Sequence, residues 1–258
     1  MVAFPHGGSD LAGLEARFVS PWLARRDADW HIAELYEFVR GLGATTVATR
    51  ISRAVIDVNR DPSGASLYPG QATTELCPVT TFDGEPLYAG AAPDAGDIEW
   101  RRMTFFDPYH AALAAELARL RAIHPRVVLY DAHSIRSRIP RLFAGELPQF
   151  NIGTNSGASC APELTEMVVD ASLFHDLDGA WSGVVNGRFK GGWTTRHYGA
   201  PEGGVHAIQM ELAMRGYMDE PNAPDETNWP PSINPEPTVQ PILRQVIAAC
   251  LAFAKGQS

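Results

Sequence analysis

The chain has 258 residues, of which 45% are apolar and 20% are charged, as in ordinary globular proteins. Its 30 acidic and 21 basic residues give a net charge of −9, which argues against a nucleic-acid-binding surface. No apolar run approaches the roughly 18 residues of a membrane-spanning helix, so no membrane partner is expected.

The three cysteines, Cys77, Cys160 and Cys250, lack C-x-x-C spacing and favour neither a disulfide framework nor a thiolate zinc site. No charged segment followed by an apolar core opens the chain, so no secretory signal is predicted. We therefore expect a reduced, cytoplasmic protein.

The first 95 residues predict short elements followed by a long irregular stretch. A helix is expected over 29–43, with Asp29 as a plausible cap. Residues 60–95 are rich in Pro, Gly, Asp and Ser without any period, which is typical of a lid or site wall. Extended segments are expected at 2–4, 44–51 and 52–59.

The rest of the chain alternates predicted helices and strands. A clear helix over 109–124 precedes the apolar strand 127–130, which is the unit of a parallel or mixed sheet covered on both faces. No internal repeat is present, so residues 1–258 are expected to form one domain. Further strands are expected at 150–152, 182–185 and 205–210, helices at 161–173, 211–218 and 238–254, and surface chain at 220–236.

Polar residues gather where predicted strands end: His6, His133 and the segment 186–199. Ligands bind outside the carboxyl ends of strands in open α/β sheets, so these groups are expected at one rim. Asp131 and His133 share a face of their strand, and Asp131 is suited to orient His133 if that histidine binds a metal. A merely polar strand end remains the alternative.

Two basic segments are candidates for binding an anion. In 52–60, Arg53 and Asp57 are spaced to pair, and Arg60 beside Asn59 is suited to clamp a carboxylate. The segment 186–199 places cations among glycines that let backbone approach a ligand, although a solvated loop has the same composition.

Glu211 ends a strand-like run that begins at Val205. A carboxylate beside a hydrated metal is what a metal-assisted hydrolase needs to move a proton. A glutamate favoured by the dipole at a helix N-terminus explains this position equally well.

Seven segments occur along the chain in the order PHGGSD, DADWHIAELY, SRAVIDVNRDPSG, LYDAHSIRS, FNIGTNSGASC, NGRFKGGWTTRHYG and GGVHAIQMEL. Together they resemble the N-formylglutamate amidohydrolase family over about residues 4–218. The resemblance extends distantly to aspartoacylase and the zinc carboxypeptidases, and it implies a three-layer α/β/α fold with a mixed central sheet, of the phosphorylase/hydrolase-like type.

The resemblance implies a divalent metal, Zn²⁺ or an ion such as Co²⁺, held by His6, His133 and a carboxylate. The wider superfamily has His-x-x-Glu at the first ligand pair, whereas Ser9 follows His6 here and Asp10 lies one step further. Asp29 is our choice for the third ligand. The chain begins only five residues before His6, so the true start is expected upstream.

The resemblance also implies roles for the other site residues. Glu211 is expected to be the catalytic carboxylate, and Arg53 to polarise the scissile carbonyl. Asn59 and Arg60 are expected to bind one substrate carboxylate. Arg196 is expected to bind the other, with Arg136 as its alternative.

The implied reaction is hydrolysis of the small molecule N-formyl-L-glutamate to L-glutamate and formate, a step of histidine degradation. The alternative is a related deacylase acting on another N-acyl or N-formyl acidic amino acid. A metabolite sensor without catalysis would lack the proton-moving carboxylate, and Glu211 is present. The oligomeric state and the pairing of each arginine with a carboxylate stay open.

Overall fold

A computed structural model describes residues 1–173, 181–235 and 238–256. Within these ranges the strands form one six-stranded sheet in the order β2-β1-β3-β6-β4-β5. Neighbouring strands are parallel except β4 and β6, which run antiparallel, so the sheet is mixed. The strands are β1 (Val2–Phe4), β2 (Thr46–Ala48), β3 (Val127–Ile135), β4 (Phe150–Gly153), β5 (Gly183–Val185) and β6 (Val205–Ala213).

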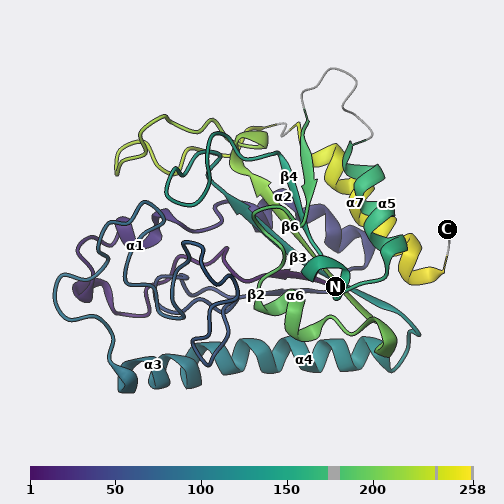
Figure 1. Ribbon diagram of the computed structural model, residues 1–258, viewed down its shortest axis with the longest axis horizontal. Coiled ribbons are helices and arrows are strands. Elements are labelled where there is room, and N and C mark those ends of the chain that lie inside the picture. The colour runs from purple at the N-terminus through teal and green to yellow at the C-terminus, as the bar shows by residue number, and fades with distance from the viewer. Residues whose placement is uncertain (174–180, 236–237, 257–258) are drawn as a thin grey trace.

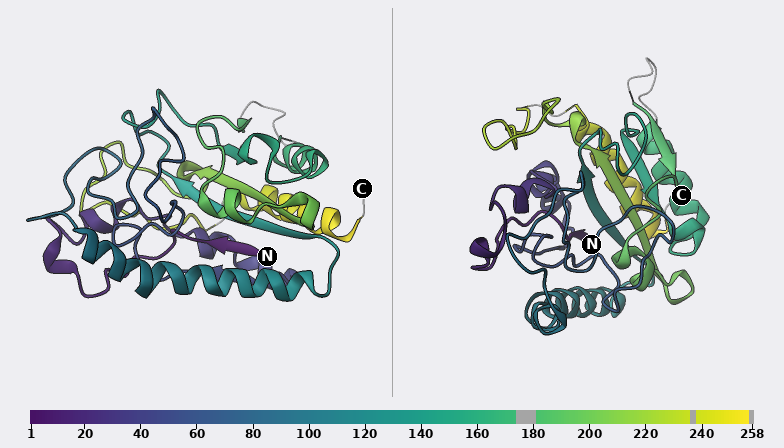
Figure 2. Two further views of the ribbon diagram at one scale, coloured as in Figure 1. Left: turned by 60° about the horizontal axis from the view of Figure 1, so that its bottom comes forward. Right: turned by 60° about the vertical axis from the view of Figure 1, so that its left-hand side comes forward.

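Helices cover both faces of this sheet, as Figures 1 and 2 show. The long helix α4 lies against one face, and α5 and α7 pack together on the other. The predicted three-layer α/β/α fold with a mixed central sheet is thus confirmed. The α-helices are α1 (Leu23–Arg26), α2 (Ile32–Leu35), α3 (Ala95–Arg101), α4 (Asp107–Arg121), α5 (Pro162–Leu173), α6 (Trp193–Tyr198) and α7 (Gln240–Lys255).

Alternation along β3 divides its side chains between two cores. Val128 and Tyr130 belong to the core that includes α5 and α7, whereas Val127 and Leu129 belong to the core that includes α4. Because side chains alternate along a strand, His133 lies on the α4 face with Leu129. β3 is longer than the predicted strand 127–130 because it pairs with β6 along its whole length.

The helix predicted over 29–43 is wrong as one continuous element. The structure has the short α2 followed by the 3-10 helix Glu37–Leu42, and His31 before α2 has a left-handed backbone with φ 59°. Asp29 does not cap a helix, because its carboxylate accepts a hydrogen bond from the Ser134 amide on β3. That contact directs Asp29 toward the sheet.

The extended segment predicted over 52–59 is also wrong, because these residues form successive turns. Ser52 Oγ accepts from the Ala54 amide, and Asp57 Oδ1 accepts from the Asn59 amide at 2.9 Å. Such local bonds from side chain to backbone compete with sheet pairing. The turns still bring Arg53 and Asp57 together, as their spacing predicted.

The short helix predicted over 211–218 is wrong in its first residues. β6 continues through Ala213, and only Met214–Gly216 forms a 3-10 turn. Pairing with β3 as far as Ile135 extends the strand, so tertiary contacts override the local preference. Glu211 therefore lies within a strand, and its interpretation as a helix-terminal residue is excluded.

The helix predicted over 109–124 is present as α4 and is joined to α3 by the π-helical segment Arg102–Phe106. Position 236 of the predicted surface segment 220–236 lies outside the described residues. Among the helices of the described ranges, none has both the length and the apolar character needed to cross a membrane.

Candidate active site and metal centre

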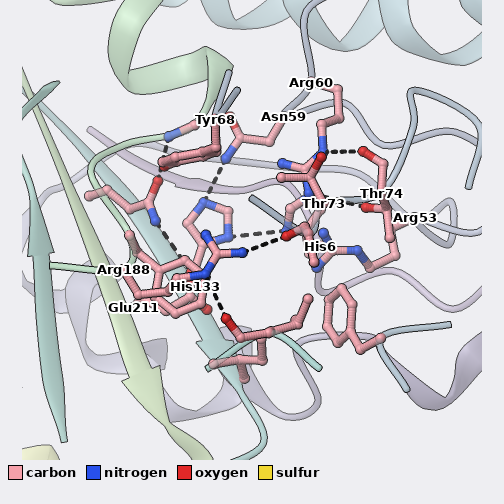
Figure 3. A pocket seen from close by; sticks show the side chains of 17 residues that line it. His6, Arg53, Asn59, Arg60, Tyr68, Thr73, Thr74, His133, Arg188 and Glu211 are labelled. Carbon is pink, nitrogen blue, oxygen red and sulfur yellow. Dashed lines mark hydrogen bonds between the residues drawn. The ribbon is translucent and has the colours of Figure 1, made fainter. Parts of the chain in front are cut away.

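Three neighbouring strands bring the predicted site residues to one rim of the sheet. His6 follows β1, His133 lies on β3 and Glu211 lies on β6. β3 pairs with both other strands, and its register places His133 directly beside Glu211. The residues that line the resulting cavity are drawn in Figure 3.

His6, Asp29 and His133 form a buried group of potential metal ligands. The Nδ1 atoms of the two histidines are 3.1 Å apart, and Asp29 Oδ2 lies 3.2 Å from His133 Nδ1 and 3.8 Å from His6 Nδ1. Ligand atoms about 2.1 Å from a tetrahedral Zn²⁺ would be roughly 3.4 Å apart. The donor set and its spacing therefore fit a small divalent ion.

Each histidine has a buried carboxylate behind it. His6 Nε2 donates to Asp57 Oδ1 at 2.6 Å, and His133 Nε2 lies 3.2 Å from Asp131 Oδ1. A carboxylate at the far ring nitrogen fixes the orientation and raises the basicity of a metal-binding histidine. The predicted relation of Asp131 to His133 is thus present in the geometry.

The buried charges perturb one another strongly. Burial and the Arg53 cation lower the pKa of His6, which keeps its imidazole neutral. Burial alone would lower the pKa of His133, but Asp131, Asp29 and Glu211 outweigh it and hold that pKa well above its ordinary value. The pKa of Asp29 is lowered in spite of burial by both histidines and Arg53, so it is a carboxylate.

Glu211 stands beside this group with few polar contacts. Burial, followed by the charges of Asp29 and Asp131, raises the pKa of Glu211 to about 8, although His133 and Arg53 act in the opposite direction. Its Oε2 accepts a hydrogen bond from Gln209 Nε2 at 3.3 Å. A carboxyl group with a pKa near neutrality is suited to accept and return a proton.

The cavity at this rim holds about 570 Å³ of empty space and opens to solvent. Three arginines line it, Arg53, Arg60 and Arg188, opposite Glu211. The irregular segment 60–95 supplies Tyr68, Thr73, Thr74 and Phe82 to the wall, as its composition predicted for a site wall. The cationic lining of this pocket suits a small anionic ligand.

Each of these arginines is held by protein groups. Arg53 Nη2 donates to Asp57 Oδ2 at 2.8 Å, and the Arg53 guanidinium lies 4.7 Å from the centre of the Phe82 ring. Arg60 donates to both the backbone and the hydroxyl oxygen of Thr74.

Arg188 differs because, within the described residues, no carboxylate forms an ion pair with it, whereas Arg53 and Arg60 both face Asp57. Arg188 donates to the backbone oxygens of Leu142 and Ala72, at 2.9 and 2.6 Å, and extends into the cavity (Figure 3). Burial lowers its pKa, and the Arg60 charge acts in the same direction. A substrate carboxylate would be a stronger partner for this cation than a carbonyl oxygen.

The other predicted substrate contacts are less direct. Asn59 lines the cavity, but its Oδ1 accepts from the Thr194 amide and its Nδ2 lies 2.9 Å from His133 Nε2. The structure does not place Arg136 or Arg196 among the lining residues of this cavity. Arg136 bonds to Asp83, and Arg196 donates to the Gly191 carbonyl behind Tyr68. Asp10 accepts from the Ala12 amide and is not part of the ligand group.

Some site residues were not singled out from the sequence. Gln209 bonds both the Gly192 amide and Glu211, and its signal was its strand alternation with Glu211. Arg188 was noted only as one of several cations in the segment 186–199. Tyr68 and Phe82 had no sequence signal, because the segment that carries them has no periodicity.

The rim of this mixed sheet gathers paired histidines, a buried carboxyl group and arginines, which are the groups that a hydrolase acting on an anionic substrate requires. Residues 1–218 match the family model described as N-formylglutamate amidohydrolase. The chain belongs to this family, whose members are hydrolases acting on an amide bond. The predicted resemblance is confirmed.

Curated relatives agree with this assignment. The chain is 48% identical over 222 residues to an N-formylglutamate deformylase from Pseudomonas aeruginosa, covering 85% of this chain and 82% of the relative. It is 43% identical over 258 residues to an N-formylglutamate deformylase from Pseudomonas putida, covering 98% and 92%.

Solved structures support the fold. An N-formylglutamate amidohydrolase from Ralstonia eutropha JMP134 superposes with a TM-score of 0.76 at 23% identity, covering 99% of this chain and 92% of that one. A gene product from Agrobacterium tumefaciens gives a TM-score of 0.62 at 16% identity, with 99% and 88% covered.

Proposed function

We propose that this protein hydrolyses the formamide bond of N-formyl-L-glutamate and releases L-glutamate and formate in a metal-dependent reaction. The observation that carries the proposal is one cavity that joins a buried ligand group, Glu211 and three arginines. The named activity of the two Pseudomonas relatives supports the choice of substrate.

His6, Asp29 and His133 would hold the metal, for which we propose Zn²⁺ or a similar ion such as Co²⁺. Two imidazole nitrogens and one carboxylate oxygen are ligands that Zn²⁺ accepts, and a catalytic site leaves a further position open. Asp29 Oδ2, the oxygen that faces both histidines, also accepts from the Ser134 amide, which fixes this carboxylate in the orientation that a ligand needs. When bound, such an ion supplies Lewis-acid chemistry and makes water acidic enough to attack at neutral pH.

Glu211 is proposed as the group that moves the proton. As a carboxylate it takes a proton from the attacking water, and as an acid it returns this proton to the departing amine nitrogen. Burial and the neighbouring carboxylates raise the pKa of Glu211, which favours its holding the proton and returning it. Gln209 orients the carboxyl group through its amide.

Arg53, Arg60 and Arg188 are proposed to recognise the substrate. Arg53 lies closest in the fold to the ligand group, with Nη1 3.6 Å from Asp29 Oδ1, and would stabilise negative charge on the formyl oxygen. Arg60 and Arg188 would bind the two carboxylates of the substrate. Asn59 would then position Asp131, since its Nδ2 donates to Asp131 Oδ2 and its Oδ1 accepts from the Thr194 amide.

We also propose a cytoplasmic role in histidine degradation. The three cysteines are buried free thiols, which suits a reducing compartment. The sequence resemblance supports the pathway.

Formate release by the purified protein tests the proposal. N-formyl-L-glutamate should be turned over by zinc- or cobalt-loaded protein, and chelation should abolish turnover. N-formyl-L-aspartate and N-acetyl-L-aspartate serve as comparison substrates. A higher kcat/KM for either comparison substrate would contradict the proposed substrate. Full activity after complete removal of metal would contradict the proposed metal dependence.

A further inference from the structure

Two carboxylates, Asp57 and Asp131, occupy equivalent places behind the two histidines, and both are fully buried. Their remaining contacts differ. Asp131 Oδ2 accepts from the neutral groups Asn59 Nδ2 and Thr195 Oγ1, each at 3.3 Å. Asp57 Oδ2 instead faces two guanidinium groups, Arg53 Nη2 at 2.8 Å and Arg60 Nε at 3.7 Å.

We infer that Asp57 is a shared positioning residue, which orients both the metal ligand His6 and the arginines of the substrate cavity. This inference rests on the proposed function and deepens it. Its consequence is that substitution of Asp57 weakens binding of metal and of substrate together, whereas substitution of Asp131 weakens binding of metal alone.

The two oxygens of Asp57 have separate partners. Oδ1 accepts from His6 Nε2 and from the Asn59 amide, and the amide fixes the rotation of the carboxyl group. Oδ2 is therefore left to the arginines. Because His6 donates through Nε2, its Nδ1 lone pair points toward Asp29 and His133, where a metal would be held.

An asparagine at position 57 would break this arrangement in either orientation. The amide has one acceptor oxygen and one donor nitrogen. If the oxygen faces His6, the nitrogen faces Arg53, and donor meets donor. If the amide is turned, its nitrogen meets two donors, His6 Nε2 and the Asn59 amide, so the first orientation is favoured. The Asp57→Asn variant therefore disturbs Arg53 directly and leaves His6 with a neutral partner in place of a carboxylate.

The loss of negative charge at position 57 would by itself have the opposite effect, namely stronger binding of the substrate. Removing one negative charge near a cationic cavity should strengthen the binding of an anion. Asp57→Asn and Asp131→Asn remove the same charge from equally buried positions. If Asp57→Asn binds substrate more weakly and Asp131→Asn does not, the change of net charge cannot be the cause. The loss of affinity would then come from misplaced arginines.

The experiment uses metal-free protein, in which substrate binds without turnover. Calorimetry measures the Kd of N-formyl-L-glutamate, and competition with a chelator measures the Kd of Zn²⁺. For Asp57→Asn we expect at least fivefold weaker binding of N-formyl-L-glutamate and about 10–100-fold weaker binding of Zn²⁺. For Asp131→Asn we expect similar loss of Zn²⁺ affinity and a substrate Kd within twofold of wild type.

The outcomes separate this inference from the proposed function. If the wild-type protein binds N-formyl-L-glutamate and Asp57→Asn binds it equally well or better, the inference is overturned while the proposed function stands. If the wild-type protein does not bind this ligand, the proposed substrate cavity is wrong and the inference is overturned with it. Circular dichroism checks that each variant is folded. If Asp57→Asn is unfolded, Asp57→Glu replaces it in the same experiment, and we expect weaker binding of N-formyl-L-glutamate and of Zn²⁺.

Discussion

Glu211 is a carboxyl group that the fold buries beside acidic neighbours and that accepts a side-chain hydrogen bond from Gln209. Replacing it by glutamine keeps the shape and removes the proton transfer. We expect Glu211→Gln to lower kcat by about 10²–10⁴-fold, the usual range for loss of general acid–base catalysis. Zinc content by elemental analysis should stay at the wild-type level, because Glu211 is not among the proposed ligands.

A Glu211→Gln enzyme with near-normal kcat would remove Glu211 from the mechanism. Loss of zinc in the same variant would instead make it a metal ligand. Gln209→Glu is unsuitable as a control because it adds a charge next to Glu211, whereas the exposed Glu202→Gln change lies outside the cavity lining and should leave kcat unchanged.

The raised pKa of Glu211 also predicts how stability depends on pH in metal-free protein. Its folded pKa is about 8 against an ordinary value of 4.5, so the folded state binds the proton more tightly than the unfolded state. This contribution is fully present below the unfolded pKa and is lost as pH rises through the folded pKa. Glu211→Gln should therefore raise Tm by several degrees at pH 8.5 and by much less at pH 5, as measured by scanning calorimetry. Equal Tm differences at both values would contradict burial as the cause.

Arg188 and Arg196 provide a matched pair for testing substrate recognition. Both guanidinium groups lie near the ring of Tyr68, at 5.6 and 4.9 Å from its centre, but only Arg188 lines the cavity. We expect Arg188→Gln to raise KM for N-formyl-L-glutamate by 10-fold or more, because a charged hydrogen bond contributes about 1.5–3 kcal/mol. Arg196→Gln should change KM less than twofold. Steady-state kinetics would contradict the assignment if the two effects were reversed.

At the scale of elements, the pair β3–β6 determines the chemistry of the site, because it holds His133 beside Glu211. The carboxylates around His133 raise its pKa well above the ordinary value, so below that pKa a metal must displace a proton from the ring. Zinc affinity should therefore increase with pH through the neutral range. Calorimetry in buffers of different ionisation enthalpy should detect release of about one proton per ion, and uptake without proton release would contradict this.

Long periodic elements were predicted well from the sequence, whereas the short segments that carry ligands were not. The helix α4 and the apolar start of β3 follow from local patterns that tertiary contacts reinforce. The segment 52–59 was predicted as extended because its alternation is real, yet Ser52 and Asp57 close it into turns through their own side chains. Asp29 looked like a helix cap, and only the backbone of β3 reveals its other partner.

The candidate site could be predicted in part for the same reason. His6 follows β1, and His133 and Glu211 lie near the carboxyl ends of β3 and β6, so the parallel order of these strands brings them to one rim. The choice between Arg188 and Arg196 depends on where the short helix α6 begins after the glycines, which no pattern in the sequence specifies. The roles of the candidate site residues in binding and catalysis stay predictions. The extent of the domain over residues 1–258 is likewise a prediction.

At the scale of the whole molecule, the helical layer on the far face supports the sheet without contributing to the cavity lining. Leu243 on α7 is fully buried in the core shared with β3 and β6. We expect Leu243→Ala to lower the free energy of unfolding by about 2–5 kcal/mol, while kcat at low temperature stays within twofold. Denaturant titration measures the first effect, and Ala248→Ser on the exposed side of α7 should stay within about 0.5 kcal/mol of wild type. A collapse of kcat in well-folded Leu243→Ala would show that this layer does influence catalysis.

The direct pairing of His133 with Glu211 across parallel strands has a consequence for refolding. A slip of β6 by one residue would turn Glu211 away from His133 and into the opposite core, because side chains alternate along a strand. Misaligned molecules would keep most of their secondary structure and yet be inert. Recovery of turnover after denaturation would therefore measure strand alignment, which circular dichroism alone does not detect.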